Sequence, residues 1–386
     1  MFNLLQTAAV VLLWFSLGTL VYVYVGYPLL LAVIGFFSVR PKAAPGYLPN
    51  ISMLIAAYNE DAGIRKKIED TLSLDYPADK MEILVLSDYS TDRTDEIVKG
   101  VADSRVRLLR APIRKGKTNV QNLGAEIAQG EVLIFSDATT VYHPLALQYL
   151  ACNYADPKVG AVSGRYQYFD TEGKSPTGLG MIAFWNYENF IKMMQSRIRT
   201  ISGCCGCIYS VRRAAYTPLH PDVISDLVQP LWAIQKGYRV VFEDRALAYE
   251  ETTKSSREEF SMRVRVVTRG VRGILSVPDL LNPTKYGWVS FQLISHKVLR
   301  WLVPFFLLLL FASNAVLGNH QWYRTLFALQ AAFYGFALLT LLIPLHRIWK
   351  PLGIPLYFCT LNAAALRSIL EVMRGRKYVV WETVRS

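Results

Sequence analysis

The feature that constrains the fold most is an alternation of apolar and amphipathic segments between residues 48 and 137. Each apolar segment has the length and the β-branched content of a strand, and the segments between them have the pattern of short helices. Repeated strand–helix units build a mostly parallel sheet covered on both faces, so the sequence predicts an α/β fold. The expected strands are 51–57, 82–87, 106–111 and 131–136, and the expected helices are 62–74, 92–102 and 118–128.

Polar residues directly follow three of these strands. They are Tyr58-Asn59-Glu60, Asp88 and Asp137. Because ligands bind at the carboxyl ends of parallel strands, these side chains are expected at one binding edge. Asp137 follows the apolar run EVLIFS and needs a hydrogen-bond donor, a cation or water as its partner. The absence of GxGxxG after the first strand, and of GxxxxGK[ST] anywhere, disfavours a dehydrogenase-type dinucleotide fold and a P-loop NTPase.

The N-terminal region from Met1 to Val39 has no charged side chain. About 20 apolar residues suffice to cross a bilayer, so we expect an uncleaved helix over 8–36. A signal peptide would have a basic start and a small-residue cleavage site, and neither is evident. Arg40 and Lys42 follow directly and place the C-terminal end of this helix in the cytoplasm.

Two further apolar runs, 301–317 and 326–345, are expected to leave the cytoplasm and return to it. A third run, 351–366, is short and contains Pro355 and Asn362. A basic tail that ends with Arg385 favours the cytoplasm, so this third run is expected to lie at the interface or to re-enter. The predicted organisation is a transmembrane helix (1–47), a cytoplasmic domain (48–255), interfacial helices (256–297), and C-terminal membrane helices with the basic tail (298–386).

The composition of the chain favours some classes of binding partner over others. A net charge of +12 on a chain that is 52% hydrophobic favours an anionic membrane surface or a phosphate-bearing substrate. A nucleic-acid reader would not need membrane anchors at both ends, so we expect no nucleic acid. Cys204, Cys205 and Cys207 could form a metal site, but no second Cys/His pair has zinc spacing, and packed small residues are the favoured interpretation.

An ordered set of motifs resembles the membrane-bound family 2 glycosyltransferases of the polysaccharide-synthesis type, related to the cellulose, chitin and hyaluronan synthases. The resemblance covers almost the whole chain. Its motifs are AAYNE, LSDYSTDRT, RKGKTNVQNLG, FSDATT, VGAVSGRY, FWNYENFIK, GCCGCIYSVRR, VISDLVQPLWAIQKGYRVVFEDRALAYE, REEFSMRVRVVTRG and SHKVLRWLVPF.

The resemblance implies a GT-A nucleotide-sugar fold, with a doubly wound, mixed and mostly parallel sheet flanked by transmembrane and interfacial helices. It also implies inverting transfer and a divalent cation, Mg²⁺ or Mn²⁺. Asp137 would be a metal ligand, with Thr139 in the position where a second Asp is common. A hydroxyl binds metal weakly, so metal affinity without substrate is expected to be low. The alternative for Asp137 is a helix cap or a turn carboxylate.

The same resemblance assigns the remaining site residues. Asp226 would be the general base, or alternatively a helix cap. Asp88 would accept from the uracil or ribose, or serve as a turn carboxylate. Gly203, Cys204 and Cys205 would form an acceptor-site turn. The residues expected to bind the nucleotide sugar are Ala57, Tyr58, Glu60, Asp88, Lys117, Asp137, Arg265 and Arg269.

We therefore expect an enzyme of the inner (plasma) membrane that transfers a sugar from a UDP-sugar to a polyprenyl-linked or glycan acceptor at the cytoplasmic face. Its context would be exopolysaccharide or capsule assembly, with other assembly proteins as partners. A processive β-glycan synthase is an alternative, although Arg265 and Gly270 replace the Gln and Trp of the processive motif. An inactive scaffold is another alternative, because Ser87, Thr139 and Ser225 replace common acidic residues.

Overall fold

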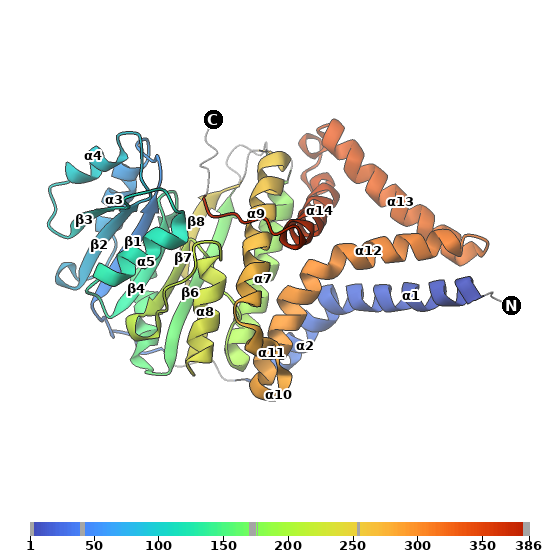
Figure 1. The fold of residues 1–386 in the computed structure, drawn as a ribbon, viewed down its shortest axis with the longest axis horizontal. Helices are drawn as coiled ribbons and strands as arrows, with labels where there is room; N and C mark the ends of the chain where they lie inside the picture. The colour runs from blue at the N-terminus through green and yellow to red at the C-terminus, as the bar shows by residue number, and fades with distance from the viewer. Residues whose placement is uncertain (1–3, 39–42, 170–174, 176, 253–254, 381–386) are drawn as a thin grey trace.

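The computed structural model describes residues 4–38, 43–169, 175, 177–252 and 255–380. Figure 1 shows a sheet with helices on both of its faces, and long helices that project from one side of it. The sheet has eight strands in the order β3-β2-β1-β4-β7-β6-β8-β5. The strands are β1 (Ile51–Ala57), β2 (Met81–Ser87), β3 (Val106–Arg110), β4 (Val132–Asp137), β5 (Val141–Tyr142), β6 (Val159–Phe169), β7 (Ile208–Arg212) and β8 (Arg239–Glu251).

The predicted α/β class and the mostly parallel first half are confirmed. Strands β3, β2, β1 and β4 pair in parallel, whereas β7 runs antiparallel to both β4 and β6. Strand β8 is parallel to β6, and the short β5 is antiparallel to β8. The pairings Ala57↔Ser87 and Ala56↔Asp137 bring the carboxyl ends of β1, β2 and β4 to one edge.

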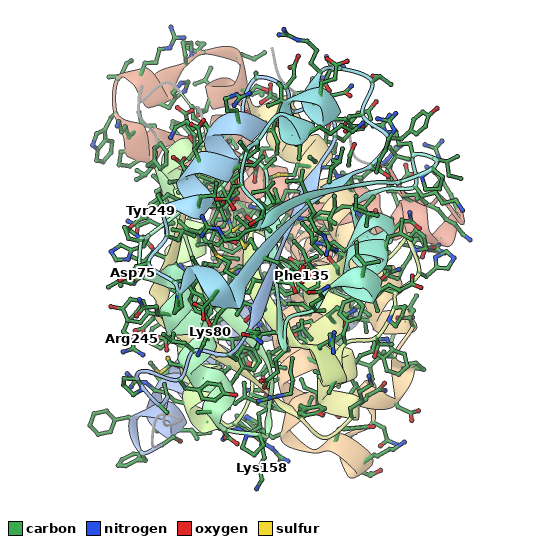
Figure 2. The ribbon with its side chains drawn as sticks, turned by 90° about the vertical axis from the view of Figure 1, so that its left-hand side faces the viewer. Asp75, Lys80, Phe135, Lys158, Arg245 and Tyr249 are labelled. Carbon is green, nitrogen blue, oxygen red and sulfur yellow. The ribbon has the colours of Figure 1, made fainter. Side chains whose placement is uncertain are left out.

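Each face of the sheet carries its own apolar core. On β1, Met53 and Ile55 point into one core, while Leu54 and Ala56 point into the other, as the two-residue period of a strand requires. In Figure 2, Arg245 lies near the outline of the molecule, whereas Phe135 is buried within it. The helices that cover the sheet are α3 (Ile64–Leu72), α4 (Thr94–Lys99), α5 (Lys117–Ile127), α6 (Ala146–Ala151), α7 (Gly178–Ile198), α8 (Ser225–Gln235) and α9 (Ser256–Leu275).

Among the described residues, four helical stretches are long and apolar enough to cross a membrane: Leu4–Phe36, Trp288–Val316, Gln321–Leu342 and Lys350–Met373. The first is continuous through a π-helical turn, Tyr22–Gly26, and α1 packs beside α12 (Figure 1). The component helices are α1 (Leu4–Val21), α2 (Tyr27–Phe36), α11 (Trp288–Leu293), α12 (Leu299–Val316), α13 (Gln321–Leu342) and α14 (Ile354–Met373), and the short α10 (Pro283–Tyr286) precedes α11.

Two details differ from the expected membrane boundaries. The helix that continues into α12 begins at Trp288, inside the segment expected to be interfacial, because a π-helical turn at Ile294–Val298 keeps it continuous. Helix α14 ends at Met373, beyond the predicted apolar run 351–366. In Figure 1 it is seen nearly end-on, whereas α1 and α12 lie across the view. An interfacial position for α14 stays a prediction. Arg40, Lys42 and Arg385, which supported the predicted orientation, lie outside the described residues.

Candidate functional site

The site is organised by one short segment, Lys115 to Lys117, at the start of α5. The carboxylate of Asp88 accepts hydrogen bonds from the backbone N–H groups of Lys115 and Gly116, each at 2.9 Å. Gly116 has a φ of 87°, in the left-handed region that glycine adopts without strain. Asp88 thereby fixes the turn from which Lys117 projects.

Asp88 is fully buried, and its own backbone N–H donates to the carbonyl of Ala57 at 2.9 Å. Burial raises the pKa of the Asp88 carboxyl, although the two backbone hydrogen bonds oppose that shift. The sequence suggested both a nucleotide contact and a turn carboxylate. The structure places Asp88 as the anchor of the 115–117 turn, and its contact with a nucleotide stays a prediction.

Lys117 is the centre of the charged constellation. Its ammonium forms an ion pair with Asp137 at the end of β4 and donates to the carbonyl of Gly206 at 3.3 Å. Burial disfavours the charged ammonium, but the charges of Asp137 and Asp226 prevail, and the pKa of Lys117 is raised. The partner of Asp137 in this structure is therefore the cation of Lys117.

Asp226 lies in the first turn of α8, beside Gly206. A Cβ atom added at Gly206 would lie 2.9 Å from the Asp226 Oδ2 atom, so this carboxylate occupies the space above the glycine. Burial raises the pKa of Asp226, opposed by the cations of Lys117 and Lys192. A carboxylate with a raised pKa beside a cation has the properties of a general base.

The segment predicted to bind the acceptor lies beside this base. The backbone N–H of Cys204 donates to the carbonyl of Asp226 at 2.8 Å, and that of Cys205 donates to Ser163 at 3.0 Å. Gly203 faces the Leu227 side chain, and the Lys192 ammonium donates to the Cys205 sulfur at 2.9 Å. Burial raises the pKa of the Cys204 thiol, which disfavours the thiolate that metal binding would need. Acceptor binding by this loop stays a prediction.

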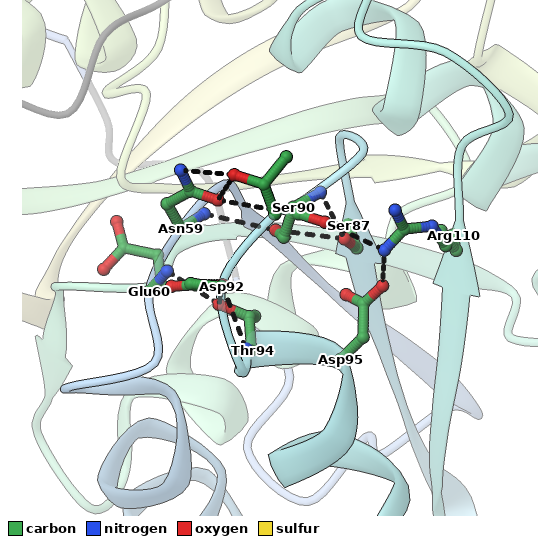
Figure 3. Close-up of polar contacts among 9 residues, drawn as sticks. Asn59, Glu60, Ser87, Ser90, Asp92, Thr94, Asp95 and Arg110 are labelled. Carbon is green, nitrogen blue, oxygen red and sulfur yellow. Dashed lines mark hydrogen bonds and ion pairs between the residues drawn. The ribbon is translucent and has the colours of Figure 1, made fainter.

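The loops after β1 and β2 are tied to each other (Figure 3). The Asn59 side chain accepts from the N–H of Thr91 at 2.8 Å, and the N–H of Asn59 donates to the Ser90 hydroxyl at 3.1 Å. Ser87, in the place of the usual acidic residue, contacts the Ser90 hydroxyl at 3.1 Å. Asn59 has a φ of 52°, which these hydrogen bonds stabilise. The loops form one rigid wall next to the 115–117 turn.

Three predicted nucleotide residues, Ala57, Tyr58 and Glu60, belong to this wall. Ala57 is buried, and the N–H of Glu60 donates to the Thr94 hydroxyl at 2.8 Å. The guanidinium of Arg114 lies over the Tyr58 ring, 3.7 Å from its centroid. Sequence reasoning missed Arg114, whose position in the run RKGK gave no signal to separate it from solvated neighbours.

Arg269 on α9 was expected to contact phosphate. It is buried, and its Nη2 donates to the Thr118 hydroxyl at 2.8 Å and to the Val223 carbonyl at 2.6 Å. Burial and the charge of half-buried Arg265 lower the pKa of Arg269 to about 10. In this structure Arg269 ties α9 to the start of α5 and to the loop before Asp226. Phosphate binding by Arg265 and Arg269 stays a prediction.

Thr139, the second predicted metal-site residue, donates its hydroxyl hydrogen bond to Glu250 Oε1 at 3.1 Å. Glu250 lies on β8 and also accepts from the hydroxyl of Tyr166. Burial and the charge of Asp137 raise the pKa of Glu250 to about 7. Sequence reasoning missed Glu250 because the antiparallel pairing of β5 with β8 brings it to Thr139 from a distant part of the chain.

The residues at this point fit a hard divalent cation. Asp137, Glu250 and Thr139 offer oxygen atoms, which Mg²⁺ and Mn²⁺ prefer. Among the described residues, no group of three or more His, Cys, Asp or Glu side chains could hold an ion. A cation here would therefore share protein oxygens with substrate phosphates and water, as Mg²⁺ commonly does.

Known proteins similar to this chain include glycosyltransferases and a polysaccharide synthase. A family described as "Glycosyl transferase family 2" matches residues 52–218. The chain is 26% identical over 231 residues to "Probable glycosyltransferase YdaM" of Bacillus subtilis (strain 168), covering 56% of this chain and 54% of that protein. It is 27% identical over 236 residues to "Poly-beta-1,6-N-acetyl-D-glucosamine synthase" of Staphylococcus aureus (strain COL), covering 58% and 56%. The matched region thus spans little more than half of each relative.

A solved structure shares the fold. It is described as "Mannosyltransferase PcManGT from Pyrobaculum calidifontis in complex with GDP-Man and Mn2+" and aligns with a TM-score of 0.75. The alignment covers 97% of this chain and 100% of that chain at 20% identity. The predicted GT-A fold is confirmed, and the family match agrees with the predicted family. Residues 52–218 of this chain match glycosyl transferase family 2, and they form part of a GT-A fold.

Proposed function

We propose that this protein transfers a sugar from a UDP-sugar to a hydroxyl of a lipid-linked or saccharide acceptor, with inversion, at the cytoplasmic face of the plasma membrane. Exopolysaccharide or capsule assembly is the proposed context. The observation that carries the proposal is the constellation of Asp137, Lys117 and Asp226, in which one ammonium pairs with Asp137 and is also attracted by the charge of Asp226.

In this mechanism Asp226 removes the proton of the acceptor hydroxyl as its oxygen attacks the anomeric carbon. The bond between that carbon and the diphosphate breaks on the opposite face, so the configuration inverts. Lys117 projects from a turn held by Asp88 and stabilises the negative charge of the departing diphosphate. A divalent cation held by Asp137 would neutralise further charge on the diphosphate. The Cys204–Asp226 hydrogen bond keeps the acceptor loop next to the base.

Donor screening tests this proposal. Purified protein in detergent is incubated with a panel of nucleotide sugars and polyprenyl-linked acceptors, and the released nucleoside diphosphate is measured. We expect release from at least one UDP-sugar, and loss of release in Asp226→Asn with nucleotide binding retained. Full activity of Asp226→Asn would contradict the assignment of the base.

A processive synthase is a second candidate, favoured by one contact. Gly270 stands where processive members carry Trp, and the indole of Trp301 from α12 lies 3.0 Å from the position of an added Cβ at Gly270. Trp301 therefore places an aromatic ring beside Gly270 from a different helix. One relative is also named as a polymer synthase. Product length distinguishes the candidates: purified protein alone makes a polymer if it is processive and a single-sugar product if it is not.

A further inference from the structure

The replacement of an expected Asp by Thr139 leaves the end of β4 with one carboxylate, Asp137. The structure brings a second carboxylate to the same place from a distant strand. Strand β5 follows the 137–140 turn and pairs antiparallel with β8 through Val141↔Tyr249, so Glu250 lies directly beside that turn. The hydrogen bond from the Thr139 hydroxyl to Glu250 Oε1, at 3.1 Å, confirms this proximity.

Glu250 is held in position from two sides. The Tyr166 hydroxyl donates to its Oε2 atom, and the Thr139 hydroxyl donates to its Oε1 atom. These neutral donors orient the carboxylate, which forms no ion pair within the part of the chain that the structure describes.

Two ammonium groups lie near this pair of carboxylates, that of half-buried Lys117 and that of buried Lys67. Lys117 forms its ion pair with Asp137, and Lys67 donates to the carbonyl of Thr140 at 2.6 Å. Burial lowers the pKa of Lys67 to about 8, against the attraction of Asp137 and Glu250. The Lys117 ammonium thus pairs directly with Asp137, whereas Glu250 receives only longer-range attraction from Lys117 and Lys67.

We propose that Glu250 supplies the second protein carboxylate of the divalent-cation site, in place of the Asp that Thr139 replaces. This inference rests on the proposed function, which requires a cation at Asp137. Two carboxylates together with substrate phosphates and water suit Mg²⁺ or Mn²⁺, whereas a carboxylate and a hydroxyl alone bind them more weakly. The inactive-scaffold interpretation loses its strongest argument, because the missing acidic group is provided elsewhere in the fold.

Mn²⁺ binding tests the assignment without measuring activity. Free Mn²⁺ is measured by electron paramagnetic resonance while purified full-length protein in detergent is titrated in the presence of UDP. We expect Glu250→Gln to weaken Mn²⁺ binding about tenfold or more, comparable to the loss of a ligand or its supporting group. Glu251→Gln is the matched control, because Glu251 is its exposed neighbour, and we expect it to bind Mn²⁺ as the unmodified protein does.

A double variant distinguishes the loss of a metal ligand from a failure to fold. Thr139→Asp in the Glu250→Gln background returns a carboxylate to the end of β4, so it should restore most of the lost Mn²⁺ affinity. Unchanged binding in Glu250→Gln, together with weakened binding in Asp137→Asn, would overturn the role of Glu250 and leave the proposed function standing. Unchanged binding in both single variants would overturn the metal role in the proposed function as well.

Discussion

Substitution of Gly206 by alanine probes the position of the base without removing any functional group. The added methyl group would lie 2.9 Å from the Oδ2 atom of Asp226, whereas ordinary contacts begin at 3.4 Å. The carboxylate must therefore move by about 0.5 Å. A misplacement of about 1 Å costs roughly 100-fold in rate, so we expect kcat to fall about tenfold.

The assay is the release of nucleoside diphosphate at saturating donor and acceptor. We expect the donor KM to change little, because the loops around Asn59 and Ser90, which we propose to contact the donor, are untouched by Gly206→Ala. Gly100→Ala is the matched control: its methyl group would make only ordinary 3.5 Å contacts at the end of α4. A Gly206→Ala variant with unchanged kcat would refute the reasoning that Asp226, in its observed position, accepts the proton.

Three further outcomes are expected. Asp226→Asn should lower kcat by about 100- to 10,000-fold and leave UDP binding within about twofold in a calorimetric titration; a normal kcat would exclude the base assignment. Since burial raises the pKa of Asp226 and the base acts deprotonated, activity should fall on acidification at a higher pH than for an ordinary Asp, and a pH–rate profile flat down to pH 4 would contradict this. Excess chelator should stop turnover, and re-added Mn²⁺ should restore it; turnover that persists in chelator would rule out the role of Asp137 in metal binding.

The first half of the sheet could be predicted because its signals are local. Strands β1, β2 and β4 are apolar runs that end in polar residues, and their parallel pairing follows from the helices between them. The convergence of Asp88 and Asp137 on one edge follows from the same rule. Strands β5 to β8 depend on long-range pairing, parallel between β6 and β8 and antiparallel elsewhere, for which the sequence carries no local signal.

The contacts that individual site residues make were harder to predict from the sequence. A carboxylate in a turn can face a ligand or its own backbone, and Asp88 bonds two backbone N–H groups in a way that only coordinates reveal. Arg269 could be recognised as a motif arginine, but its hydrogen bonds to Thr118 and Val223 depend on how α9 packs. The pairing of β5 with β8 brings Glu250 to Thr139. Nothing in the sequence around either residue indicates this contact.

The central claim is that Asp226 drives a single displacement on a sugar whose diphosphate is held at Lys117 and Asp137. The most direct measurement is the anomeric configuration of the product of a single turnover, determined by proton nuclear magnetic resonance with the donor that the screen identifies. The account predicts a product whose configuration is opposite to that of the donor, formed by the unmodified protein and absent with Asp226→Asn. A product that retains the donor configuration would contradict it.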